Sequence, residues 1–278
     1  MTISRATKPL IVVWVALTLL TGQDDIPERF QAHPLEGTTA TTNTLYLGEE
    51  RIWIHIHEAS EPGLTYVRIH DDENTAREAA QIFIRDHGGR LVEFRHGRGR
   101  EVVIRRNGIQ ERFDPNRMFS DLGLERTLFR YGNSTPENIA LVQQFREQVS
   151  DLIGIEAGKT IISVHNNTEG NLTIEDYAEG EMYGLGTEEL YISPTEDPDD
   201  FFITNERILF DALKSQGFNV VLTVDQHPRD PGSLHRYVNR LGGVAVTVEA
   251  EHGHLEKQIH MLEVVNEIIK DLSSEQAR

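Results

Sequence analysis

The stretch YVRIHDDENTAREAA, residues 66–80, predicts a strand that passes directly into a helix. Its first residues end a strand pattern over 64–70, and a helical pattern follows over about residues 74–87. His70 and Glu73 stand three residues apart at the turn between the two patterns. In open α/β sheets, working side chains collect at the carboxyl ends of strands. The ends of the other predicted strands therefore indicate which residues could join this pair.

Further strand and helix patterns lie on both sides of this unit. Strands are predicted over 51–59, 64–70, 90–96, 100–113 with a hairpin turn at Asn107-Gly108, 160–166, 218–225 and 243–251, and helices over 74–87, 136–154, 204–216 and 254–274. Several strands are almost continuous apolar runs, which is typical of a sheet that helices bury on both faces. No linker rich in Pro or Ser divides the chain, so we expect one α/β domain over residues 49–278.

The N-terminal residues have the layout of a secretory signal peptide. Arg5 and Lys8 precede an apolar run over 10–20, and small and polar residues follow it. That run is well short of the roughly 20 residues needed to span a bilayer, which disfavours the alternative of an uncleaved membrane anchor. We expect residues 1–22 to be removed on export, leaving a periplasmic or secreted protein without stable membrane insertion. Residues 23–48 are rich in Thr, Gly and Pro, and predict an irregular N-terminal arm.

Composition limits the possible partners and metal ligands. The chain carries 27 Lys and Arg against 45 Asp and Glu, for a formal net charge of −18. This charge disfavours nucleic acid as a partner. The chain has no cysteine, so His, Asp and Glu would have to hold any transition metal.

Three residues are candidate metal ligands. His70 and Glu73 can place an imidazole nitrogen and a carboxylate oxygen on one ion, and His165, near the end of the strand TIISVHN (160–166), is the natural third ligand. Three protein ligands leave a fourth position open for water. His55 and His57 alternate on one face of an early strand, and we interpret them as structural.

Two further segments supply candidate residues for substrate binding and for a general base. Asn116 and Arg117 follow the predicted hairpin, where an arginine either forms a surface ion pair or grips a substrate carboxylate through two parallel hydrogen bonds. Glu249 and Glu251 end the strand GVAVTVEAE (243–251) on the same side. Either carboxylate, beside a metal site, could act as a general base.

Taken in chain order, these motifs resemble the zinc carboxypeptidase superfamily over residues 50–270. The motifs FDPNRMF (113–119) and VHNNT (164–168) are most similar to its aspartoacylase and succinylglutamate desuccinylase branch. Two motifs depart from that branch: RIHDDENT (68–75) stands where a Gly-rich turn is usual, and VEAEHGH (248–254) replaces the usual Glu-Val-Gly-Pro.

The resemblance implies a single domain with a mixed, mostly parallel sheet flanked by helices. It implies Zn²⁺ as the cofactor, held by His70, Glu73 and His165, with Glu249 as base. Asn116, Arg117 and Asn166 would bind the substrate, a small carboxylate-bearing peptide or N-acyl amino acid. The expected activity is hydrolysis of an amide or peptide bond next to a free carboxylate. The alternatives are a metal-binding protein of the same fold without turnover, and a zinc deacetylase or esterase.

Overall fold

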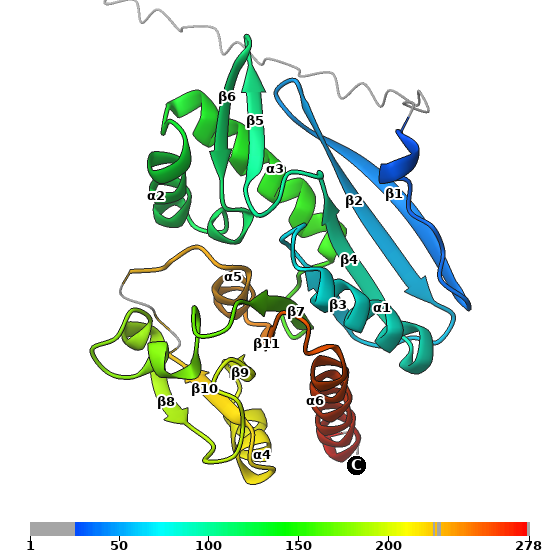
Figure 1. Cartoon of the computed structure of the whole chain (residues 1–278), viewed down its shortest axis with the longest axis vertical. Coiled ribbons are helices and arrows are strands. Elements are labelled where there is room, and N and C mark those ends of the chain that lie inside the picture. The colour runs from blue at the N-terminus through cyan, green and yellow to red at the C-terminus, as the bar shows by residue number, and fades with distance from the viewer. Residues whose placement is uncertain (1–25, 225, 227–228, 277–278) are drawn as a thin grey trace, which may run out of the picture.

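The computed structural model describes residues 26–224, 226 and 229–276 of the chain (Figure 1). The predicted signal peptide over 1–22 lies outside the described residues. Among the described residues, no helix combines the length and the apolar character that a membrane crossing requires.

One large mixed sheet forms the centre of the described chain. Its nine strands lie in the order β1-β2-β4-β3-β7-β11-β9-β10-β8. The bounds are β1 (Thr38–Leu47), β2 (Glu50–Ala59), β3 (Thr65–Arg68), β4 (Arg90–Arg95), β7 (Thr160–Asn167), β8 (Thr187–Tyr191), β9 (Phe201–Thr204), β10 (Asn219–Thr223) and β11 (Val244–Glu251). The central strands β4, β3, β7 and β11 are mutually parallel. The predicted α/β class, with a mixed sheet whose strands mostly share one direction, is confirmed.

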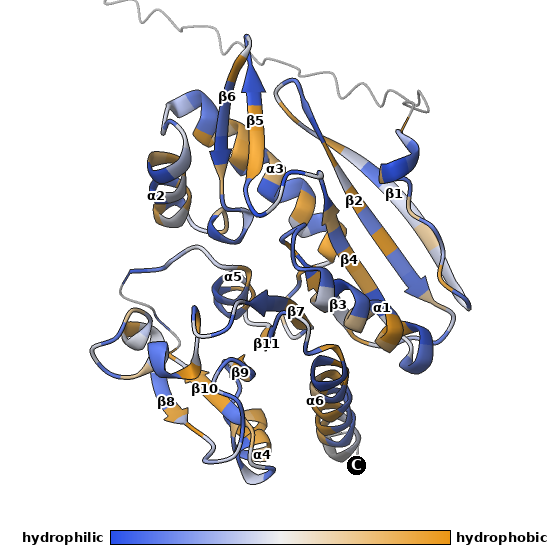
Figure 2. Ribbon diagram, in the orientation of Figure 1, coloured by the Kyte–Doolittle hydropathy of each residue, from blue (hydrophilic) through white to orange (hydrophobic). Residues whose placement is uncertain are grey.

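Helices cover both faces of this sheet. Their bounds are α1 (Asn74–His87), α2 (Asp121–Tyr131), α3 (Pro136–Ile153), α4 (Arg207–Ser215), α5 (Leu234–Arg240) and α6 (Leu255–Gln276), with 3-10 turns η1 (Glu28–Phe30), η2 (Pro115–Arg117), η3 (Ile174–Tyr177) and η4 (Gly184–Gly186). Residues of α1, α4 and α6 share one buried apolar cluster with the sheet, and residues of α2, α3 and α5 share another. Figure 2 shows both apolar and polar residues recurring along α6, as expected for a helix with one buried side.

The predicted hairpin over 100–113 forms a small separate sheet. Its strands are β5 (Val102–Arg106) and β6 (Ile109–Phe113), joined at Asn107-Gly108, where both residues have positive φ. Buried residues of both strands pack in the cluster that includes α2 and α3. The hairpin therefore carries the chain from the sheet to η2, the turn that holds the Asp-Pro-Asn-Arg segment.

Several segments differ from the sequence prediction, among them the strand β8, which was not predicted. Residues 38–47, expected within an irregular arm, form β1, which pairs antiparallel with β2 from Thr38 opposite Ala59 to Leu47 opposite Glu50. A Thr-rich strand has β propensity without an apolar alternation, so its pairing partner decides its structure. Residues 201–204, where no strand was predicted, form the buried four-residue strand β9. The helix α4 begins only at Arg207. The helices α2 and α5 were not predicted.

Candidate metal and active site

His70, Glu73 and His165 meet at the carboxyl ends of β3 and β7. His70 follows β3, Glu73 immediately precedes α1, and His165 lies in β7, which pairs in parallel with β3. The Nδ1 atom of His70 lies 2.8 Å from Oε1 of Glu73, and the Nδ1 atom of His165 lies 3.0 Å from Oε2. All three side chains are buried, with ligand-type atoms within 4.8 Å of one another. The structure therefore brings together the three ligands expected from the sequence.

The charges within this group shift the pKa values of its members. Burial lowers the pKa of His70, but the carboxylates of Glu73 and Asp114 outweigh burial and raise it to about 9. Burial likewise raises the pKa of Glu73, but the two facing imidazoles hold it well below its usual range. The carboxylate of Glu73 is therefore ionised, and its negative charge favours a positive charge between the three side chains.

Asp114 supplies the remaining contact of His70. Its Oδ1 atom lies 2.9 Å from Nε2 of His70 and also accepts a hydrogen bond from the backbone N–H of Asn116. With an ion bound at Nδ1, the ring hydrogen would stay on Nε2 and His70 would donate it to Asp114. Histidines that bind metals usually donate their second ring N–H to a carboxylate in this way. Two imidazoles, one carboxylate and this supporting carboxylate fit a divalent transition-metal ion.

Glu249 borders the same group from the neighbouring strand. It lies on β11 directly opposite His165 of β7, and its side chain is buried. Burial, the largest effect, raises the pKa of Glu249; the charge of Glu73 also raises it, while His165 opposes the shift. Glu251 instead lies with its Oε2 atom 3.7 Å from Nε2 of His254. Of the two candidate bases, Glu249 is the one beside the metal-ligand group.

Two neighbouring cavities that share lining residues lie at this edge of the sheet. The larger, of about 810 Å³, is lined by residues that include Glu73, Arg100, Asp114, Arg117 and Glu249. The smaller, of about 130 Å³, shares Arg100, Arg117 and Glu249 and extends to the polar side chains of Ser163, His235 and Thr247. A substrate in the larger cavity would therefore lie beside Glu249 and Glu73, and His165 lines the smaller cavity next to Glu249.

Asn116 and Arg117 lie in η2 at the wall of these cavities. The side-chain oxygen of Asn116 accepts a hydrogen bond from the N–H of Leu234, which ties η2 to the start of α5. An Nη1 group of Arg117 donates to the carbonyl oxygen of Asn116 at 2.8 Å. Among the described residues, the Arg117 guanidinium forms no ion pair with a carboxylate, although its charge acts on Asp114. Arg117 is therefore available to a ligand carboxylate.

Asn166 lines the larger cavity, but its amide is engaged within the protein. Its oxygen accepts from the N–H of Ala76 at 2.7 Å, and its nitrogen donates to the carbonyl of Ala250 and to the side chain of Gln258. These bonds join β7 to α1, β11 and α6. A direct contact with substrate stays a prediction for this residue.

Arg100 and Asp114 are site residues that the sequence reasoning did not select. Arg100 donates to Oε1 of Glu73 at 3.1 Å and lies 3.8 Å from Oδ2 of Asp114. Asp114 could have been identified from the sequence, because it stands two residues before Asn116 in the FDPNRMF motif. Arg100 could not have been identified in this way, since nothing in the sequence distinguishes it from the many other arginines of its segment.

Comparisons with known proteins found similarity among solved structures. No protein-family model and no curated protein sequence matches the chain. Among solved structures, it is similar to the succinylglutamate desuccinylase of Chromobacterium violaceum, with 13% identity, a TM-score of 0.40, and 84% of this chain and 69% of that chain covered. It is also similar to an aspartoacylase family protein of Mesorhizobium loti, with 12% identity, a TM-score of 0.39, and 84% and 66% covered.

A third similar structure is the N-formylglutamate amidohydrolase of Ralstonia eutropha, with 10% identity, a TM-score of 0.34, and 80% of this chain and 98% of that chain covered. All three TM-scores are below 0.5. We therefore base the functional assignment on the side-chain geometry.

Proposed function

We propose that this protein is a zinc-dependent hydrolase that cleaves an amide or peptide bond next to a free carboxylate. The observation that supports it most directly is that the buried Glu249 lies opposite His165 of the His70, Glu73 and His165 group. Glu249 and Glu73 line the same cavity as Arg117. His70 through Nδ1, His165 through Nδ1 and Glu73 through its carboxylate would hold the ion. A bound zinc ion would supply Lewis-acid chemistry, activating water and polarising the scissile carbonyl.

Glu249 would act as the general base. Its raised pKa brings its proton affinity closer to neutral pH, which suits a carboxylate that takes a proton from water and passes it to the leaving amine. Its burial keeps bulk water away from this transfer. Asp114 would keep the His70 ring in the orientation that directs Nδ1 toward the ion.

Arg117 would grip the substrate carboxylate. A guanidinium pairs with a carboxylate through two parallel hydrogen bonds, and this contact fixes where the neighbouring bond lies. The larger cavity also receives Arg126 and Arg130 from α2, on the side of η2. This side of the cavity concentrates positive charge in a chain of net charge −18, and so favours an anionic substrate.

The proposed location is outside the cytoplasm. The signal-peptide pattern over 1–22 supports export, and export favours a cell-wall peptide or a scavenged N-acyl amino acid as substrate. Expression of the full chain, followed by fractionation and sequencing of the mature N-terminus, tests this proposal. Retention of residues 1–22 on a cytoplasmic protein would contradict it.

The reaction class is tested by pairing a carboxylate substrate with its neutral amide. Zinc-loaded wild type should hydrolyse at least one N-acyl amino acid or peptide of a panel, and should process the matching amide at least about tenfold more slowly, since Arg117 then lacks its partner. In Arg117→Lys this gap should narrow, because lysine offers one mobile point charge instead of a fork. Arg85→Lys, on the exposed surface of α1, is the matched control.

Two other outcomes of this experiment would support a different function for the protein. Equal turnover of acid and amide by wild type would remove Arg117 as a substrate clamp and favour a deacetylase or esterase. Zinc binding with no turnover across the panel would favour a binding protein.

A further inference from the structure

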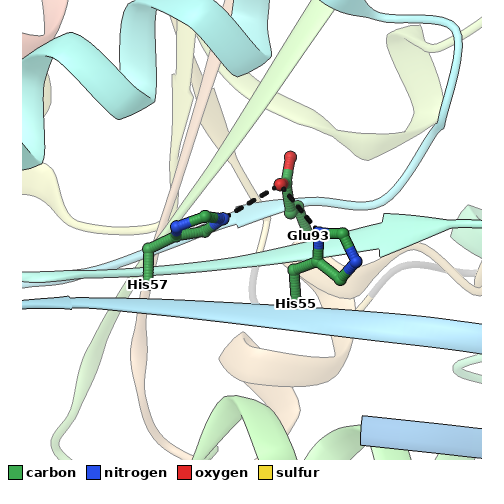
Figure 3. Close-up of side chains that lie close together, drawn as sticks. All are labelled: His55, His57 and Glu93. Atoms are coloured by element: carbon green, nitrogen blue, oxygen red, sulfur yellow. Dashed lines mark hydrogen bonds and ion pairs between the residues drawn. The ribbon is translucent and has the colours of Figure 1, made fainter. Parts of the chain in front are cut away.

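A second group of two imidazoles and one carboxylate lies on β2 and β4. His55 and His57 point from the same face of β2, and Glu93 lies on β4 directly opposite His55. All three side chains are buried, and each offers a ligand-type atom within 4.8 Å of the others (Figure 3). None of the three lines either cavity described above. The sequence-based interpretation of His55 and His57 as structural histidines leaves this convergence unexplained.

The hydrogen bonding of His55 points to a positive charge between its ring and Glu93. Its Nε2 atom lies 2.8 Å from the carbonyl oxygen of Phe30, so Nε2 carries a hydrogen and donates it. Its Nδ1 atom lies 3.5 Å from Oε1 of Glu93. In a neutral ring, that nitrogen would direct a lone pair at a carboxylate oxygen. A metal ion between the two atoms, or a second proton on the ring, removes this repulsion.

His57 approaches the same carboxylate oxygen. Its Nε2 atom lies 3.1 Å from Oε1 of Glu93, while its Nδ1 atom is buried and has no hydrogen-bond partner among the described residues. Figure 3 shows both rings directed at Glu93 from β2. One oxygen atom thus receives two imidazole nitrogens from adjacent positions on one strand face.

Arg68 holds the other oxygen of Glu93. Its Nη2 group donates to Oε2 at 3.2 Å and also to Oδ1 of Asp71 at 3.3 Å. Asp71 is shared between this fully buried arginine and Arg95, whose Nη1 lies 3.2 Å from the same Oδ1 atom, and Oε1 of Glu93 faces the two histidines. Contacts of this kind orient a ligating carboxylate in metal sites.

We propose that His55, His57 and Glu93 hold a second divalent ion, separate from the one at His70. Two imidazoles and a carboxylate suit zinc or a similar transition-metal ion, and the burial of all three ligands suits a structural site. The ion would hold His55 in the orientation that binds the Phe30 carbonyl. Phe30 also stacks on Trp53, with ring centroids 3.9 Å apart, so the ion would fasten η1 to β2.

The direct test counts tightly bound metal in the purified chain. After zinc loading and desalting, inductively coupled plasma mass spectrometry should find two equivalents in wild type and one in His57→Gln. The control His260→Gln changes an exposed histidine on α6 and should keep two. A single equivalent in both wild type and His57→Gln would overturn the proposal.

A second measurement leaves the proposed ligands intact, in case His57→Gln does not fold. In His70→Ala/His165→Ala, only Glu73 remains of the first ligand group, so one zinc should persist at the second group. X-ray absorption on that ion should show imidazole ligands. A folded double variant without zinc would overturn the second site while leaving the first site, and the proposed hydrolase, untouched.

Discussion

The Nε2 atom of His70 lies 2.9 Å from Oδ1 of Asp114, a residue 44 positions away in the chain. This contact joins the end of β3 to the turn after the β5-β6 hairpin. It leaves the other ring nitrogen of His70 facing Glu73. The orientation of one proposed metal ligand therefore depends on a residue that directly follows the separate two-stranded sheet.

Replacing Asp114 should weaken metal binding at the first ligand group without abolishing it. Asp114→Asn removes the charge that favours a hydrogen on Nε2 of His70, and changes to such supporting residues typically cost about 10- to 100-fold in metal affinity. Competition with a chromophoric chelator measures this affinity. Asp121→Asn, at the exposed start of α2, is the control, and an unchanged zinc Kd in Asp114→Asn would contradict the proposed role.

Removing His70 itself should cost one full equivalent of zinc. His70→Ala leaves His165 and Glu73, and two protein ligands rarely hold zinc against water. Metal analysis of the desalted variant, beside wild type and His260→Gln, measures the loss. Wild-type zinc content in His70→Ala would show that the ion lies elsewhere.

Glu249→Gln should retain zinc and lose activity. The amide keeps the size of the side chain but cannot accept a proton, so kcat should fall by roughly 10² to 10⁴. Glu251→Gln is the matched control, because its carboxylate faces His254. The assignment of the base fails if the loss appears in Glu251→Gln and not in Glu249→Gln.

Stability should fall below about pH 6.5 partly because of His235. Burial, together with the neighbouring charge of Arg236, lowers the pKa of His235 to about 3, against an ordinary value of about 6.5. Above pH 6.5 neither the folded nor the unfolded state protonates this ring. As pH falls from 6.5 toward 3, only the unfolded state gains the proton, so the free energy of unfolding decreases by up to about 1.4 kcal/mol per pH unit.

Urea unfolding at several pH values measures this decrease. His235→Gln cannot titrate, and should lose less stability than wild type between pH 6.5 and pH 4, whatever its stability at pH 7. His260→Gln, an exposed histidine, should follow wild type. Equal pH slopes for wild type and His235→Gln would contradict the shifted pKa.

Local sequence patterns predict much of the fold and the three residues proposed as the first ligand group. The strand-to-helix turn places His70 and Glu73 within one turn of chain, so their proximity follows from local geometry alone. His165 is predictable because it lies near the end of an apolar strand, where α/β sheets gather functional groups. Strand β1 cannot be predicted from local patterns, because its Thr-rich sequence has no apolar alternation. Its pairing with β2 orders it.

The remaining features of the site depend on which distant segments lie side by side. Glu249 and Glu251 are equivalent in the strand pattern, and only the pairing of β11 with β7 and the position of His254 separate them. Likewise, His55 and His57 form a ligand group only because β4 places Glu93 opposite them. The order of strands in a sheet is set by packing among residues far apart in sequence, and no local periodicity encodes it. The sequence by itself therefore determined most of the central strands and the residues available for metal chemistry, whereas the tertiary structure decided which of those residues meet.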